Sequence, residues 1–171
     1  LSIGWDIAQR GAAEPYVAQT LERFGRLDFA FNNASLEFIP EEMEQGGAFS
    51  LIDITDDHYD RVMDTNVFGT FDGMKHQIKA MLKHGQGGAI VNMDSIAGTG
   101  SCPYVGNVYC GSRHAITGLT TNAARDWAGK GIRINAVLPG VVDSGEHRVG
   151  IDDFVSYHPI GRLGQSDDVA D

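Results

Sequence analysis

Short apolar runs alternate along this chain with longer segments in which apolar residues recur every three or four positions. The runs at 27–31, 89–93 and 132–138 are typical of buried strands, and residues 1–7 have the character of a strand's end. The segments between them have the spacing of amphipathic helices. Alternating strands and helices favour a parallel sheet with right-handed crossovers and helices on both faces.

Three helices are predicted from the apolar spacing. The first begins near Pro15 and ends at Gly25, and the second is one long helix that begins near Tyr59, with Thr55 or Asp56 as its N-cap. The third lies just before the last strand. The apolar positions that carry the spacing are Val17, Leu21 and Phe24 in the first helix, Val62, Met63, Val67, Phe71, Met74, Ile78 and Met81 in the second, and Ile116, Leu119, Thr120, Ala123 and Trp127 in the third.

Polar residues close the 27–31 strand, where Asn32-Asn33 follows the last apolar residue. Ligands of open α/β sheets bind at the carboxyl ends of the strands, so we expect this pair to face a ligand. The segment 36–50 comes next; it is acidic, contains glycine and has no sustained period. We interpret it as a surface loop or a lid.

The composition indicates one globular domain that binds a small molecule. The chain has 171 residues, of which 42% are hydrophobic, and this is enough for a substantial core. A net charge of −10 argues against nucleic acid or an anionic membrane surface as a partner. Cys102 and Cys110 lack paired CxxC spacing, the histidines lack metal-ligand spacing, and no apolar run has the length of a membrane span. The first residues also lack a basic and apolar leader, so we expect a cytoplasmic protein with no metal site.

Three side chains form a candidate chemical group. Ser95 follows the 89–93 strand, and Tyr109 and Arg113 lie four positions apart on the next helix, hence on one face of it. A cation fixed beside a phenol favours the phenolate and lowers its pKa from about 10 toward neutral pH. The pair can then serve as acid and base in redox chemistry at an alcohol or a carbonyl.

The order and separation of several motifs resemble the short-chain dehydrogenase/reductase family, the single-domain Rossmann oxidoreductases, over nearly the whole chain. The matching pieces are Asp6-Ile7, Phe24-Gly25-Arg26-Leu27-Asp28, Asn32-Asn33-Ala34-Ser35, Asn66, Ser95, Tyr109, and Pro139-Gly140 with Ser144. The resemblance implies a Rossmann-like, doubly wound parallel sheet in three α/β/α layers. It also implies NAD or NADP as cofactor and hydride transfer with a small alcohol or ketone substrate.

The resemblance also implies residue roles. Tyr109 matches the general acid/base, Ser95 the hydroxyl that binds the substrate oxygen, and Arg113 the position of a lysine that assists the tyrosine. Asn66 matches the residue that kinks the long helix and helps bind the water of a proton relay; the alternative is a helix residue that satisfies a nearby carbonyl. The matching cofactor contacts are Asp6 and Ile7 at the adenine, Asn33 and Ala34 at the ribose, Tyr109 and Arg113 beside the nicotinamide ribose, and Val142 and Ser144 at the carboxamide.

Two positions and one spacing depart from the family's pattern. Arg113 keeps the positive charge of the lysine but does not lose a proton near neutral pH, so electrostatic activation survives and a proton relay is impaired; alternatively it is a solvated helix charge. Ser35 replaces the last glycine of Asn-Asn-Ala-Gly and adds a side chain near the cofactor. The spacing from Ser95 to Tyr109 is one residue longer than usual, which a loop around Pro103 absorbs.

The family's glycine-rich phosphate loop has no counterpart here, since Gly4, Gly11 and Gly25 do not form GxGxxG. We therefore expect residues 1–171 to be a single partial NAD(P)-binding domain, N-terminally truncated, with the 27–31 strand at the sheet edge and apolar surface exposed. Two alternatives to the enzyme stay open: a non-catalytic nucleotide-binding or scaffold relative, and an inactive fragment. The long helix and the tyrosine helix commonly form a homodimer or homotetramer interface in this family.

Overall fold

The sheet of this protein has three parallel strands in sequential order. The structure, a computed structural model, describes residues 2–37, 50–100, 105–143 and 151–170. The strands are β1 (Phe29–Asn32), β2 (Gly88–Met93) and β3 (Ile132–Val137), and β2 pairs with both others. Asn32 is level with Asn92, and Ile90 is level with Ile134. All carboxyl ends therefore meet at one end of the sheet.

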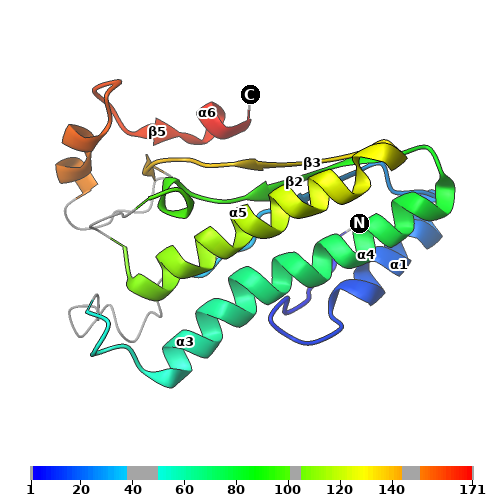
Figure 1. The fold of residues 1–171 in the computed structure, drawn as a ribbon, viewed down its shortest axis with the longest axis horizontal. Helices are drawn as coiled ribbons and strands as arrows, with labels where there is room; N and C mark the ends of the chain where they lie inside the picture. Colours follow the sequence, from blue (N-terminus) through cyan, green and yellow to red (C-terminus); the bar gives the residue numbers. More distant parts are fainter. Residues whose placement is uncertain (1, 38–49, 101–104, 144–150, 171) are drawn as a thin grey trace.

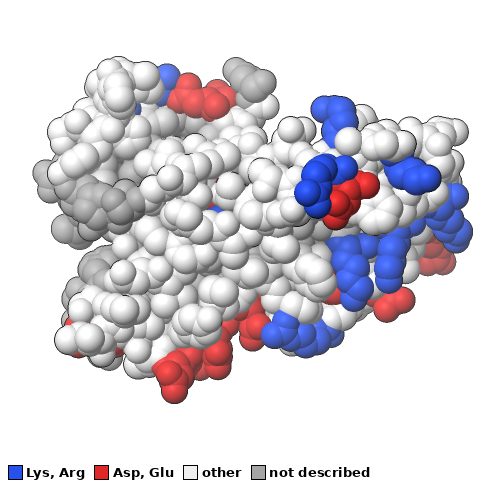
Figure 2. Space-filling view, in the orientation of Figure 1, with Lys and Arg blue, Asp and Glu red and all other residues white. Residues whose placement is uncertain are grey.

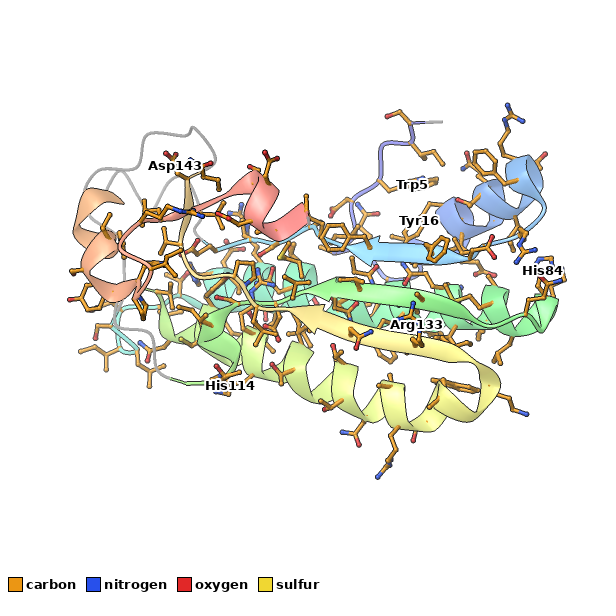
Figure 3. The ribbon with its side chains drawn as sticks, turned by 90° about the horizontal axis from the view of Figure 1, so that it is seen from above. Trp5, Tyr16, His84, His114, Arg133 and Asp143 are labelled. Atoms are coloured by element: carbon orange, nitrogen blue, oxygen red, sulfur yellow. The ribbon has the colours of Figure 1, made fainter. Side chains whose placement is uncertain are left out.

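The long helices all lie on one face of this sheet, below it in Figure 1. Their bounds are α1 (Ala13–Phe24), α3 (Asp56–Met63) and α4 (Gly69–His84), joined by a π-helical turn at Asp64–Phe68, and α5 (Asn107–Trp127). Figure 3 shows α1 beyond the edge of β1, on the side of Trp5 and Tyr16, and α5 on the opposite side, beneath β3. The predicted long helix is therefore present, with one irregular turn inside it.

Local signals in the sequence set the helix ends. Thr55, one of the two predicted caps, is the N-cap of α3, and its hydroxyl accepts a hydrogen bond from the His58 N–H at 3.1 Å. Gly25 ends α1 with φ of 79°, and its N–H donates to the Leu21 carbonyl at 2.8 Å. A side chain is strained at that positive φ, so glycine is the residue that allows the chain to turn toward β1.

The main core lies between the sheet and α4. Met74, Ile78 and Met81 of the predicted helix stripe pack against Ile90 of β2 and against two isoleucines of β3, Ile132 and Ile134. Trp127, Leu119 and Ala123 of α5 cover the same cluster and are partly buried. Phe71 of the stripe differs, because its side chain is 44% exposed. The apolar spacing therefore predicted the sheet-facing part of α4 correctly.

A chain of buried amides crosses the same layer and was not expected. Asn92 is fully buried, accepts a hydrogen bond from the Asn32 Nδ2 at 2.8 Å and donates to the Thr120 Oγ1 at 2.8 Å. Asn32 and Gln77 exchange two further hydrogen bonds, at 2.7 and 3.1 Å. The expectation that Asn32 faces a ligand stays a prediction, because its amide is hydrogen-bonded toward the helices and the residue also lines a cavity beside β1.

The opposite face of the sheet carries little cover among the described residues. Phe29 and Phe31 of β1, the predicted edge strand, are 76% and 55% exposed. Near the carboxyl ends, a second small sheet pairs β4 (Val142–Asp143) in parallel with β5 (Gly164–Gln165), followed by α6 (Ser166–Ala170) above the sheet in Figure 1. A 3₁₀-helix at Ile151–Tyr157 lies between them. These short elements were not predicted.

The predicted strand at residues 1–7 is wrong for the described part of this range, since residues 2–6 adopt no regular structure and Ile7 begins a turn. Ile7 instead packs on Gly69 at the start of α4, where an added Cβ would come 2.8 Å from the Ile7 Cδ1. A strand needs a hydrogen-bonded neighbour, and the described residues offer none at this position.

The surface of the described residues is unevenly charged. Figure 2 shows lysines and arginines gathered at the end where α4 and α5 finish, and a largely uncharged area over the middle of the molecule. Lys83, Arg125 and Lys130 belong to that basic end. Within the described ranges, no helix is both long enough and apolar enough to cross a membrane.

Candidate active site

A cavity of about 510 Å³ opens at the carboxyl ends of β1 and β2. It brings together five of the residues singled out from the sequence: Asn33, Ser95, Tyr109, Arg113 and Val142. The remaining lining residues are Phe31, Met93, Asp94, Pro139, Gly140, Ser166, Val169 and Ala170. Most of the predicted chemical group therefore shares one concave surface, at the place where open α/β sheets bind ligands.

Ser95 is held in place by the turn that follows β2. It is the extended N-cap of a 3₁₀-helix at Ile96–Gly98, and its hydroxyl accepts a hydrogen bond from the Ala97 N–H at 3.2 Å. The Ser95 N–H donates to the Asp94 Oδ1 at 2.9 Å, and Thr117 of α5 donates to the other Asp94 oxygen at 2.5 Å. Asp94 therefore ties the Ser95 turn to the tyrosine helix.

Burial and charge act on the Tyr109 phenol in opposite directions. Burial, the larger effect, raises the pKa of Tyr109 above its ordinary value, whereas the Arg113 charge and hydrogen bonds with Arg113 and Ser95 lower it. Glu37 adds a smaller contribution that raises this pKa. The net direction differs from the lowered pKa expected from the sequence, because helical spacing reveals the cation but not the depth of the phenol.

Arg113 is a buried residue and not a solvated helix charge, since only 3% of it is exposed. Its Nη1 donates to the Met93 carbonyl at 2.8 Å, and its Nη2 donates to the Ser35 Oγ. The guanidinium carbon lies 4.7 Å from the centroid of the Tyr109 ring, within the range of a cation–π contact. Among the described residues, the Arg113 Nε is a buried donor with no partner.

Asn66 lies in the π-helical turn and is 1% exposed. Its amide oxygen accepts from the Leu36 N–H at 2.7 Å, and its Nδ2 donates to the Leu36 carbonyl at 2.8 Å. The same Nδ2 lies 3.0 Å from the Ser112 Oγ, which in turn donates to the Tyr109 carbonyl at 2.7 Å. Asn66 thus connects the long helix to the segment after β1 and to the tyrosine helix.

A second cavity, of about 400 Å³, lies on the β1 side and holds two more of the predicted cofactor contacts. Ile7 and Ala34 line it, and Asn33 lines both cavities. Asp6 lines neither of these two cavities, and its carboxylate instead accepts a hydrogen bond from the Ala8 N–H at 3.0 Å. Ser144 lies outside the described residues.

His158 supports the Pro139-Gly140 turn that lines the first cavity, a contact that the sequence did not reveal. Its Nε2 accepts from the Val141 N–H at 3.0 Å, and its Nδ1 lies 2.8 Å from the Phe154 carbonyl, which fixes the proton on Nδ1. A Cβ on Gly140 would come 2.5 Å from the His158 Nε2, so glycine is required in the Pro139-Gly140 turn. Because both of these His158 hydrogen bonds are made with backbone groups, no pattern of side chains in the sequence predicts the position of His158.

The residues around these cavities fit a nicotinamide cofactor. The two cavities share Asn33, which suits a long ligand with two parts. Amide, hydroxyl and guanidinium groups are available for the polar atoms of such a ligand, from Asn33, Ser95, Tyr109 and Arg113. The unpartnered Arg113 Nε is one buried donor that such a ligand would satisfy. Within the described residues, no group of three His, Cys, Asp or Glu side chains is arranged to hold a metal ion.

Comparison with known proteins shows the family. A family model described as enoyl-(acyl carrier protein) reductase matches residues 2–171. The chain is 41% identical to a 2,5-dichloro-2,5-cyclohexadiene-1,4-diol dehydrogenase of Sphingobium indicum over 94% of its own length and 63% of the relative's. It is 35% identical to a sorbitol dehydrogenase of Cereibacter sphaeroides, over 98% of this chain and 68% of that one. The protein belongs to the short-chain dehydrogenase/reductase family.

Solved structures agree with this assignment. ElxO with NADP bound superposes with a TM-score of 0.83 at 34% identity, over 96% of this chain and 65% of that one. A short-chain dehydrogenase/reductase from Mycobacterium marinum gives a TM-score of 0.84 at 26% identity, over 98% of this chain and 63% of that one. The fold is the Rossmann-like α/β fold expected from the sequence, and the chain spans a little under two thirds of the length of most of these relatives.

Proposed function

We propose that the protein is an NAD- or NADP-dependent oxidoreductase that acts on a small alcohol or the corresponding ketone. The observation that carries this proposal is the convergence of Ser95, Tyr109 and Arg113 on one cavity at the carboxyl end of β2. The names of its relatives as dehydrogenases and the NADP bound to a structural neighbour support it. The cytoplasmic location expected from the sequence stays part of the proposal, as does the absence of nucleic-acid and membrane partners.

In this proposal Tyr109 handles the proton. During reduction the Tyr109 hydroxyl gives its proton to the carbonyl oxygen, and during oxidation the phenolate takes the proton of the alcohol. Ser95 donates a hydrogen bond to the same oxygen and holds it near the phenol. The cofactor supplies or accepts the hydride. Because burial raises the pKa of Tyr109, the phenol is protonated near neutral pH, which suits reduction, and oxidation becomes faster as pH rises toward that pKa.

The remaining predicted residues complete the proposal. Asp6, Ile7, Asn33, Ala34, Val142 and Ser144 would contact the cofactor, together with Tyr109 and Arg113. Asn66 would help to hold a proton-relay water through its turn of the long helix, and its contact with Ser112 places that turn beside the tyrosine helix. Arg113 would stabilise the phenolate by its charge, without itself exchanging a proton near neutral pH.

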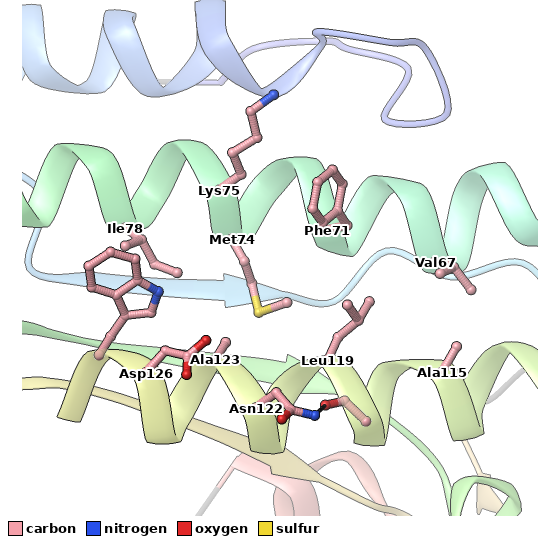
Figure 4. A pocket seen from close by; sticks show the side chains of 12 residues that line it. Val67, Phe71, Met74, Lys75, Ile78, Ala115, Leu119, Asn122, Ala123 and Asp126 are labelled. Carbon is pink, nitrogen blue, oxygen red and sulfur yellow. Dashed lines mark hydrogen bonds between the residues drawn. The ribbon is translucent and has the colours of Figure 1, made fainter.

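We propose a homodimer or homotetramer that forms through α4 and α5. These helices border an apolar groove of about 600 Å³, whose lining includes Phe71, Leu119 and Trp127. Figure 4 shows Leu119 of α5 pointing toward α4. Lys75 of α4 and Asp126 of α5 also line the groove, and the Lys75 ammonium lies 3.7 Å from Asp72 of its own helix. An exposed apolar groove of this kind is a surface that a second copy of the chain would cover, which favours self-association.

The proposal is tested with the complete gene product and its Tyr109→Phe variant. We expect calorimetry to show binding of NADH or NADPH to both proteins, and Tyr109→Phe to lower kcat with an alcohol or ketone by about 100-fold or more. Tyr59→Phe removes an exposed phenol from α3 and should leave kcat unchanged. Unaltered turnover in Tyr109→Phe contradicts the catalytic assignment. Cofactor binding without turnover in the unmodified protein supports the non-catalytic alternative, which the replacement of lysine by Arg113 favours.

A further inference from the structure

Two positions at which this chain departs from its family's sequence pattern are in contact with each other. Ser35 stands where the pattern has glycine, and Arg113 stands where it has lysine. The two residues are 78 positions apart, and the Arg113 Nη2 donates a hydrogen bond to the Ser35 Oγ. Glycine has no side-chain acceptor, so a glycine at position 35 could not accept this hydrogen bond. The Ser35 hydroxyl therefore supplies an acceptor for the Arg113 guanidinium.

The guanidinium uses both of its terminal nitrogens as anchors. Its second nitrogen, Nη1, donates to the Met93 carbonyl at the end of β2, at 2.8 Å. The planar fork of arginine spans two acceptors in a fixed geometry, whereas a lysine ammonium is a single point charge on a flexible stem. Because Nη2 is bound to Ser35 and Nη1 to Met93, the guanidinium has one orientation beside the Tyr109 ring. Its carbon lies 4.7 Å from the ring centroid.

We propose that Ser35 is a positioning residue for proton transfer at Tyr109, and that Ser35 and Arg113 act as one unit. This inference rests on the proposed oxidoreductase function. The Ser35 hydroxyl keeps a permanent cation against the phenol, which stabilises the phenolate. Without that hydroxyl the guanidinium loses one of its two anchors outside the tyrosine, so its orientation beside the ring is no longer fixed. Ser35 itself is exposed, so its replacement should leave the fold intact.

A double-mutant cycle tests this coupling in the complete gene product. The proteins are the unmodified enzyme, Ser35→Gly, Arg113→Lys and the double variant, with circular dichroism to confirm folding. Two readouts are measured: kcat and KM as functions of pH, and the titration of the Tyr109 phenol by ¹³Cζ NMR. Tyr109→Phe identifies the resonance among the five tyrosines. The NMR titration needs neither cofactor nor turnover.

We expect each single variant to lower kcat about tenfold with little change in KM, and Ser35→Gly to raise the pKa of Tyr109. The double variant restores the family's own glycine and lysine, so it should recover to within about threefold of the unmodified enzyme. Such recovery is a large non-additive effect of the kind shown by residues in direct contact. Ser35→Thr keeps the hydroxyl and should retain activity, whereas Ser35→Ala should behave as Ser35→Gly.

Two results overturn the inference. One is a double variant whose loss equals the product of the two single losses. The other is a Ser35→Ala variant with unchanged kcat and an unchanged Tyr109 titration. Thr121→Ala, which removes an exposed hydroxyl elsewhere on α5, is the matched control and should change neither.

The two readouts separate this inference from the function on which it rests. Coupling in the Tyr109 titration without turnover of any alcohol or ketone supports the Ser35–Arg113 unit and contradicts the oxidoreductase proposal. Turnover without coupling contradicts the Ser35–Arg113 unit alone.

Discussion

Asp94 shows how a single side chain can link the site to the stability of the fold. It is 2% exposed and holds the Ser95 turn and Thr117 of α5 through its two oxygens. Burial raises the pKa of Asp94, and the hydrogen bonds from Thr117 and the Ser95 N–H offset part of that rise. A Cβ on Gly98 would come 2.7 Å from the Asp94 Oδ1, so the turn leaves room for this carboxylate and for little else.

The raised pKa of Asp94 predicts a specific pH dependence of stability. A carboxyl group whose pKa is higher in the folded than in the unfolded state adds stability that is fully present below the unfolded pKa, about 3.9, and lost as pH rises through the folded pKa. Urea unfolding of Asp94→Asn should therefore show the variant gaining stability relative to the unmodified protein as pH rises. Asp53→Asn, at an exposed position, is the control. A difference that is constant with pH contradicts the prediction.

At the scale of elements, periodicity identified what depends on local sequence. The strands β1 to β3, the cap at Thr55 and the stripe of Met74, Ile78 and Met81 follow from apolar spacing, and the structure has them. The order of the family motifs predicted that Ser95 and Tyr109 act together, and both residues line one cavity. What spacing could not predict depends on contacts between segments distant in sequence.

Three findings belong to this second kind. Asn32 was expected at a ligand and lines a cavity, but spacing did not predict its hydrogen bonds with Gln77 and Asn92, which lie 45 and 60 positions further along the chain. The depth of the Tyr109 phenol, which sets the direction of its pKa, is a property of the folded cavity. His158 acts on the backbone of Val141, and no side-chain pattern in the sequence marks such a contact.

The amide chain between the sheet and the helices predicts a stability effect. Asn92→Leu removes the central member and leaves Asn32 and Thr120 each without one hydrogen bond in a buried layer. We expect a loss of about 2–4 kcal/mol in the free energy of unfolding, measured by urea denaturation. Asn135→Leu, on the neighbouring strand and exposed, is the control. Equal free energies of unfolding for the two variants would contradict the prediction, because the buried amide would then add no more stability than an exposed one.

At the scale of the whole molecule, the long helices cover one face of the sheet, and two apolar surfaces stay open in the described residues. One is the outer face of β1, with Phe29 and Phe31, and the other is the groove between α4 and α5. Large exposed apolar areas of this kind usually mark places where protein contacts protein.

The groove predicts the behaviour of a surface variant. Phe71→Glu places a charge among Val67, Leu119 and Trp127, so it should dissociate the proposed oligomer. Light scattering coupled to size exclusion should show a lower mass for this variant and an unchanged mass for Phe24→Glu, which alters an exposed phenylalanine on α1 outside the groove. An unchanged mass for Phe71→Glu contradicts an interface at this groove.

The π-helical turn at Asp64–Phe68 allows one continuous helix to serve two different neighbours. An extra residue in a single turn advances every later side chain by about 100° around the helix axis, so the two halves of the helix are out of phase. Asn66, within the turn, contacts Ser112 of the tyrosine helix, whereas Met74 and Ile78, after the turn, pack in the core against the sheet. Deleting one residue from this turn would bring both halves into phase, and the helix could then keep its contacts with the site or with the sheet, but not with both.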